Sequence, residues 1–172
     1  MRTTTDEQPG LQWGGRFEGA PEAALIAFGS SLEDDLVLAP FDVRCSRAHV
    51  VALTEGGLLS GVAAGELHAA LDVVGDEIAD GTFAAFARAG TVEDVHGAID
   101  ARVREIAPDA GASLHAGRSR NDQVAPTLLL YARDRAAAGA RLALSIARAF
   151  EDRAQQALAD GTFLAATPHW QP

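Results

Sequence analysis

Residues 125–159 read APTLLLYARDRAAAGARLALSIARAFEDRAQQALA, and this stretch decides the fold class. Its period predicts one long helix that begins after Asn121, with Pro126 in its first turn, and ends at Asp160 and Gly161. At the rise of an α-helix it would be about 50 Å long, whereas a compact chain of this size has a radius of gyration of about 16 Å. Alanines lie all around it, so neighbouring helices can approach closely. We therefore expect an oligomeric helical bundle. The stripe along this helix consists of Leu128, Tyr131, Ala138, Leu142, Ala149 and Arg153.

Upstream of this stretch, apolar residues recur every three to five positions in several shorter segments. The expected helices cover residues 23–28, 40–56, 60–78 and 92–106. The last follows a capping-box pattern from Thr91 to Asp94, and Pro108 ends it. No segment alternates at period two over strand length, so we predict an all-α fold. We expect an amino-terminal helical domain with an extended arm over residues 1–112. Residues 113–172 would form a loop and the first part of a central bundle, which is truncated.

Composition excludes several classes of function. The formal net charge of −10 disfavours nucleic acid, because phosphate binding needs a basic face. All 14 basic residues are arginine, so the chain cannot form a lysine Schiff base or complete a Walker-type phosphate loop. One cysteine, Cys45, forbids an intrachain disulfide, and the first ten residues lack the apolar core of a signal peptide. A cytoplasmic location is expected.

The segment Gly117–Gln123, GRSRNDQ, carries the chemistry that stands out most in this chain. Arginine binds carboxylates in a bidentate manner, and the start of the following helix adds N–H groups that favour negative charge. A ligand with two carboxylates would satisfy Arg118 and Arg120. The alternative is a helix-capping loop whose arginines pair with surface acids.

The same segment resembles the substrate loop of the argininosuccinate lyase family, which usually has threonine where Ala116 stands. Further matches follow in the family's order, so the likeness covers nearly the whole chain from Trp13 onwards. It places the chain in the aspartase/fumarase superfamily of helical homotetramers. The matching segments are Trp13–Phe17, Ser31–Asp35, Asp42–His49, Glu93–His96 and His115–Gln123.

This resemblance implies a reaction and a set of site residues. The family splits argininosuccinate into arginine and fumarate by β-elimination, a step of arginine biosynthesis, without a cofactor. Ser31 and Asn121 would contact the substrate, and Ser119 and Arg120 would hold its dicarboxylate half. In the last motif, His169 would serve in acid–base chemistry. Pro168 stands where the family has a substrate-contacting threonine, so that contact is either lost or moved to Thr167.

The resemblance also implies that other segments are needed. Each active site of the superfamily draws on three subunits and on a serine-bearing loop that this sequence does not contain. We therefore expect the chain alone to be inactive, and the stop at Pro172 suggests a fragment, a truncated reading frame or a split enzyme. Two alternatives remain. One is a non-catalytic structural or interaction protein that keeps the lyase scaffold, since lens δ-crystallins resemble the same family. The other is a superfamily lyase for adenylosuccinate, fumarate or aspartate, against which the loop argues.

His49, His68 and His96 are assigned neither a catalytic nor a metal-binding role. His96 lies beside an apolar stripe and is expected to be a partly buried, hydrogen-bonded packing residue. His49 and His68 lack metal-ligand spacing, so we assign no metal. Asp94 is expected in the first turn of its helix, where the macrodipole stabilises a carboxylate.

Overall fold

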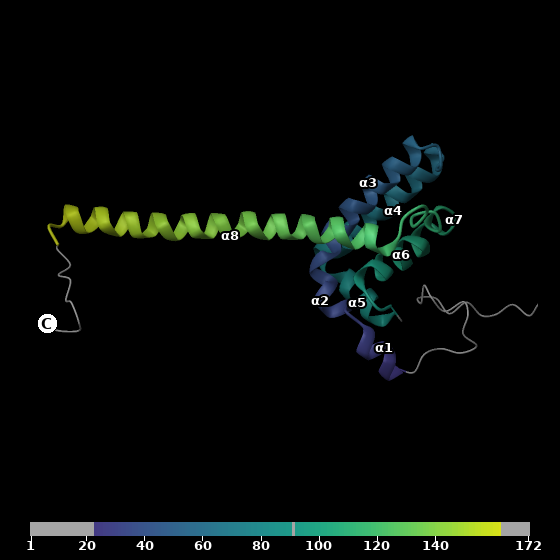
Figure 1. Ribbon diagram of the computed structural model, residues 1–172, viewed down its shortest axis with the longest axis horizontal. Helices are drawn as coiled ribbons and strands as arrows, with labels where there is room; N and C mark the ends of the chain where they lie inside the picture. Colours follow the sequence, from purple (N-terminus) through teal and green to yellow (C-terminus); the bar gives the residue numbers. More distant parts are fainter. Residues whose placement is uncertain (1–22, 91, 163–172) are drawn as a thin grey trace, which may run out of the picture. The chain divides into compact units, whose positions relative to one another are not determined.

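The computed structural model describes residues 23–90 and 92–162, and within them the chain is all-helical, as predicted (Figure 1). The chain divides into two units, Met1–Tyr131 and Ala132–Pro172. The predicted domain boundary between residues 112 and 113 stays a prediction. The described elements are α1 (Ala23–Gly29), α2 (Leu32–Asp35), the 3-10 turn η2 (Leu36–Leu38), α3 (Ala39–Glu55), α4 (Gly61–Asp80), α5 (Thr82–Ala89), α6 (Val95–Ile106), α7 (Pro108–Gly111) and α8 (Arg120–Ala159).

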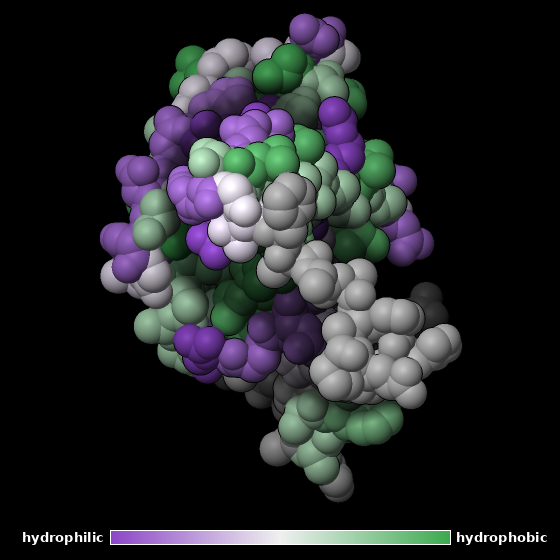
Figure 2. Space-filling view, turned by 90° about the vertical axis from the view of Figure 1, so that its left-hand side faces the viewer, coloured by the Kyte–Doolittle hydropathy of each residue, from purple (hydrophilic) through white to green (hydrophobic). Residues whose placement is uncertain are grey.

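The core of the first unit forms where α3, α4 and α6 pack against one another. Leu67, Leu71 and Val74 recur at spacings of three and four along α4, and all three are fully buried. Ile99 and Val103 on α6 complete the centre of the same cluster. The periodicity that predicted these helices therefore also identifies the faces that they bury. On the face drawn in Figure 2, hydrophobic residues stand among hydrophilic ones.

Between α4 and α6 the structure differs from the sequence-based expectation in an additional helix and in the start of α6. The Asp80–Gly81 signal ends α4, with Gly81 at a φ of 86°, but a short helix, α5, follows at once where none was predicted. The next helix begins at Val95 and not at Val92, because Asp94 adopts an extended backbone and its side chain accepts the Gly97 N–H at 2.6 Å. Asp94 is thus the N-cap of α6 and does not lie in its first turn.

Helix α8 has 40 residues, which corresponds to about 60 Å at the usual rise. It begins at Arg120, so the expectation that it starts later with Pro126 in its first turn is wrong: Pro126 lies inside the helix. Proline lacks the N–H that would bond to the Asp122 carbonyl. Both residues are exposed, so solvent can take the place of that bond.

Beyond Tyr131, α8 carries large apolar side chains that are exposed in this chain. Its two buried residues, Gln123 and Thr127, both lie in the first unit. Among the residues that the structure describes, no helix has the length and apolar character needed to cross a membrane. The exposed apolar residues of the second unit are Leu142, Leu144, Ile146, Phe150 and Leu158.

Candidate functional site

The loop that precedes α8 ends in a reciprocal cap. The Ser119 N–H donates to Asp122 Oδ2 at 2.9 Å, and the Asp122 N–H donates to Ser119 Oγ at 3.3 Å. These bonds form the capping box that a serine three residues before an acid makes at a helix start. They also lower the pKa of Asp122, because the Ser119 N–H and hydroxyl stabilise its carboxylate. Ser119, which was predicted to bind substrate, therefore holds the start of α8.

Arg120 is the first residue of α8, and its side chain is one-quarter exposed. Nη1 donates to Gln123 Oε1 at 2.8 Å. The guanidinium also faces two carboxylates, with Nε 3.5 Å from Asp94 Oδ2 and Nη1 3.7 Å from Asp100 Oδ2. One edge of Arg120 is thus tied to the protein while part of it remains accessible to an anion.

Ser31 lies in the same neighbourhood as Arg120. Its N–H donates to the Glu93 carbonyl at 2.8 Å, and its hydroxyl donates to Asp35. Asp94, the residue after Glu93, pairs with Arg120. The start of α2 is thereby joined through the segment before α6 to the start of α8, although the three elements are far apart in sequence.

The remaining predicted site residues fall into two groups. Asn121 is exposed on the first turn of α8, next to Arg120. Thr167, Pro168 and His169 lie outside the described residues.

A buried polar cluster beneath the loop was not predicted. Asp42 on α3 is fully buried and accepts hydrogen bonds from three side chains. His96 Nδ1 lies 2.7 Å from Oδ2, Ser46 Oγ donates to Oδ1 at 3.1 Å, and Gln123 Nε2 donates to both oxygens at 3.1 and 2.9 Å. The hydrogen-bonded packing role expected for His96 is confirmed, and the side chain is fully and not only partly buried. The available signal for the cluster was the spacing of Asp42 and Ser46, which are four residues apart on one helix face.

The cluster continues through Arg118 to Asp100. Arg118 Nη2 donates to Ser46 Oγ at 3.3 Å, and burial lowers the pKa of Arg118. Burial raises the pKa of Asp100, although Arg120 acts in the opposite direction. His115 Nδ1 lies 3.8 Å from Asp100 Oδ2. Two guanidinium groups therefore face buried or half-buried acids, so the positive charge of the loop is balanced within the protein.

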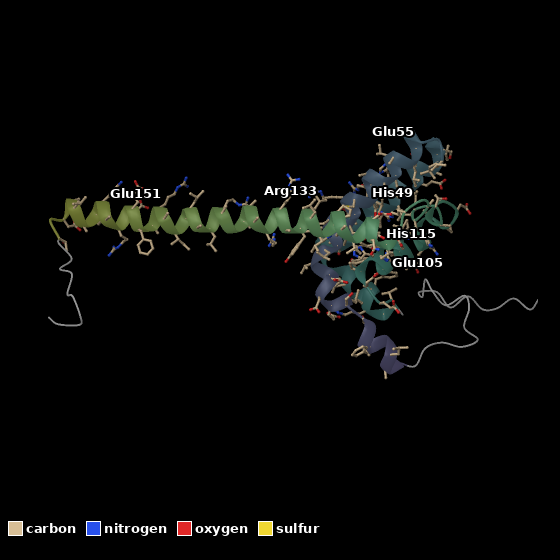
Figure 3. The ribbon with its side chains drawn as sticks, viewed as in Figure 1. His49, Glu55, Glu105, His115, Arg133 and Glu151 are labelled. Carbon is tan, nitrogen blue, oxygen red and sulfur yellow. The ribbon has the colours of Figure 1, made fainter. Side chains whose placement is uncertain are left out.

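His49 fastens the loop to α3. Its Nε2 lies 2.9 Å from the Ala116 carbonyl oxygen, which can only accept, so Nε2 carries the proton. Figure 3 labels His49 on α3 and His115 in the loop, both close to the start of α8. Within the described ranges, no group of three or more His, Cys, Asp or Glu side chains is placed to hold a metal ion.

Replacing His49 by glutamine should flatten the acid dependence of stability. Burial lowers the pKa of His49 below its ordinary value of 6.5. The unfolded chain therefore binds a proton at a higher pH than the folded chain, and stability falls as the pH drops through that window. The glutamine amide can donate to Ala116 at every pH. We expect the free energy of unfolding of wild type to fall more steeply than that of His49→Gln between about pH 7 and pH 5. Denaturant melts across this range measure both slopes, and equal slopes would contradict the assignment.

Comparison with known proteins gives a consistent result. No family model matches the chain. It is 41% identical over 146 residues to argininosuccinate lyase of Mycobacteroides abscessus. It is 46% identical over 135 residues to that of Mycobacterium avium and 44% identical over 126 residues to that of Corynebacterium jeikeium.

These alignments include most of this chain but a minority of each relative. They cover 84%, 76% and 73% of this chain, and 30%, 28% and 25% of the three lyases. The chain thus spans less than a third of the length of these relatives. By this similarity the chain is homologous to a segment of the argininosuccinate lyases, and its all-helical fold agrees with this homology.

Proposed function

We propose that the chain supplies the part of an argininosuccinate lyase that binds the dicarboxylate half of argininosuccinate. The observation that carries this proposal is the position of Arg120. Its guanidinium is fixed at the amino terminus of a long helix, is one-quarter exposed, and lies beside the segment that holds Ser31. A helix start and a guanidinium both favour a carboxylate at that place.

Each predicted site residue has a proposed role. Arg120 binds a substrate carboxylate, and Ser31 and Asn121 contact the substrate beside it. β-Elimination places negative charge next to a carboxylate, so a fixed positive group there stabilises the transition state more than the ground state. Ser119 contributes through its N-cap, which directs the first N–H groups of α8. Thr167 and His169 are proposed as a substrate contact and an acid–base group.

Turnover is proposed to need more than this chain. The exposed apolar residues of α8 beyond Tyr131 suit a helical bundle shared between copies, which we propose to be a homotetramer in the complete enzyme. We propose a cytoplasmic enzyme of arginine biosynthesis that releases fumarate once the other segments are present. Purified alone, the chain should bind the dicarboxylate without releasing fumarate.

Replacing Arg120 by alanine should weaken binding of succinate and argininosuccinate by about tenfold or more, because a hydrogen bond to a charged group contributes about 1.5–3 kcal/mol. Isothermal titration calorimetry of the 172-residue chain measures the affinity. The matched control is Arg133→Ala, which removes an exposed arginine further along the same helix and should leave the affinity unchanged.

Two outcomes would contradict the proposal: wild type that binds neither ligand, or two variants that bind equally well. In the first case the non-catalytic scaffold becomes the better reading. Asp94 and Asp100 balance the positive charge of Arg120, which leaves the loop without a surplus of positive charge and favours the non-catalytic scaffold.

A further inference from the structure

We propose that Asp42 and Gln123 are positioning residues, which fix the guanidinium of Arg120 through a buried hydrogen-bond relay. The relay runs from Asp42 on α3 to Gln123 on α8 and from Gln123 to Arg120. This inference rests on the proposed function only in taking Arg120 as the ligand-binding group.

The orientation of the Gln123 amide follows from its two neighbours. Its Nε2 lies 3.1 and 2.9 Å from the two oxygens of Asp42, which can only accept. Its Oε1 lies 2.8 Å from Arg120 Nη1, which can only donate. A flipped amide would place donor against donor and acceptor against acceptor. Gln123 is fully buried, so no solvent competes for these bonds, and the amide has one stable orientation.

The far end of the relay is held from two further directions. Asp42 Oδ2 accepts from His96 on α6, and Oδ1 accepts from Ser46 one turn along α3. Both partners are buried. The carboxylate is therefore fixed by α3 and α6 together, and it transmits the position of these two core helices to the first turn of α8.

The orientation of the Arg120 guanidinium depends more on this relay than on the neighbouring carboxylates. The contacts to Asp94 and Asp100 measure 3.5 and 3.7 Å, which is longer than the usual N–H···O distance of about 2.7–3.2 Å. Among the contacts of Arg120 with the described residues, the bond to Gln123 is the one of normal length. Without it, the flexible side chain is free to turn towards either acid. A guanidinium that binds a carboxylate in a bidentate manner must present a fixed edge, so the relay serves binding and not only packing.

The test uses Gln123→Met, which keeps the size and loses both polar ends. We expect succinate affinity to fall by about fivefold or more, because the loss of one hydrogen bond to a charged group is enough to produce it. We also expect the Arg120 Nε–H signal in nitrogen-15 NMR spectra to shift and to exchange faster with solvent. Thr127→Val is the matched control. Thr127 is equally buried one turn along α8 and bonds to the Gln123 carbonyl, but Arg120 is not among its partners.

Exchanging the carboxylate and the amide between positions 42 and 123 gives a second, independent measurement. Gln123→Glu alone faces the Asp42 carboxylate with a second buried carboxylate, so both affinity and the Arg120 signal should be disturbed. Adding Asp42→Asn supplies an amide that donates to the new carboxylate, which still accepts from Arg120. The double variant should recover the Arg120 signal and at least half of the lost affinity, which a merely structural role would not produce.

The outcomes separate this inference from the proposed function. If Gln123→Met and the control give the same Arg120 signal, or if the double variant is no better than Gln123→Glu, the relay is overturned. If wild type binds no succinate while the Arg120 signal responds as expected, the relay stands and the binding role of Arg120 fails.

Discussion

Replacing Asp42 by alanine should lower the free energy of unfolding of the first unit by about 3–5 kcal/mol, as expected when one partner of a buried, hydrogen-bonded polar group is removed. The carboxylate is fully buried and accepts from His96, Ser46 and Gln123. Alanine would leave three donors without an acceptor in a place that water does not reach. Urea denaturation followed by circular dichroism measures the change.

The control for this substitution is Asp72→Ala. Asp72 pairs with Arg47, but the Asp72 side chain is largely exposed and that of Arg47 is partly exposed, so the free energy of unfolding should stay within about 0.5 kcal/mol of wild type. The free energy of unfolding of Asp42→Asn should lie between those of Asp42→Ala and Asp72→Ala, because an amide retains one acceptor oxygen. If Asp42→Ala and Asp72→Ala had equal stability, the polar cluster would have no part in holding α3, α6 and α8 together.

Replacing Gly111 by alanine should lower the free energy of unfolding by about 1–3 kcal/mol, the usual effect of adding a group to a well-packed site. Gly111 is buried at the end of α7 against the backbone of α6. A Cβ there would lie 2.7 Å from Arg104 Cα and 3.0 Å from Arg104 N. Both are backbone atoms that cannot rotate away, so α7 and the loop that follows it would have to move.

Gly139→Ala is the matched control for Gly111→Ala. Gly139 lies within α8, and a Cβ there would meet no heavy atom within 4 Å. This variant should raise helix stability by about 0.5–1 kcal/mol, because alanine is the better helix former. Thermal melts of both variants show whether the loss of stability is specific to position 111 or is a general effect of replacing glycine by alanine. A Gly111→Ala protein as stable as wild type would mean that α6 and α7 are not in close contact.

Helices with a regular apolar stripe could be predicted from the sequence, together with the ends of α4 and α8, but the short helix α5 and the starts of α6 and α8 could not. The stripes of α4 and α6 lie on the core, and the long helix ends at Ala159 as expected. Helix α5 has only eight residues and directly follows a glycine stop signal, so its pattern is too short to separate from a loop. The start of α8 was misplaced because Pro126 was taken as a boundary, whereas the Ser119–Asp122 cap begins the helix earlier.

In the candidate site, the binding chemistry of single residues could likewise be predicted from the sequence, whereas contacts between residues far apart in the chain could not. Arg120 and its loop stand out because the residue types themselves indicate anion binding. The role of Gln123 depends on Asp42, which lies 81 residues away in the chain. No local pattern records such a pair, since only the packing of α3 against the start of α8 brings it together. Ser31 is similar, because its link to Arg120 passes through the Glu93 backbone.

The two carboxylate oxygens of Asp94 have separate roles. The interaction with Arg120 can therefore change in evolution while the helix cap is kept. Oδ1 accepts the Gly97 N–H and starts α6, while Oδ2 faces Arg120. Asparagine caps helices about as well as aspartate but carries no charge. A lineage that exchanged one for the other would alter the strength with which Arg120 attracts an anion and keep the helix start. The affinity of the loop can therefore drift through single substitutions that selection for folding does not oppose.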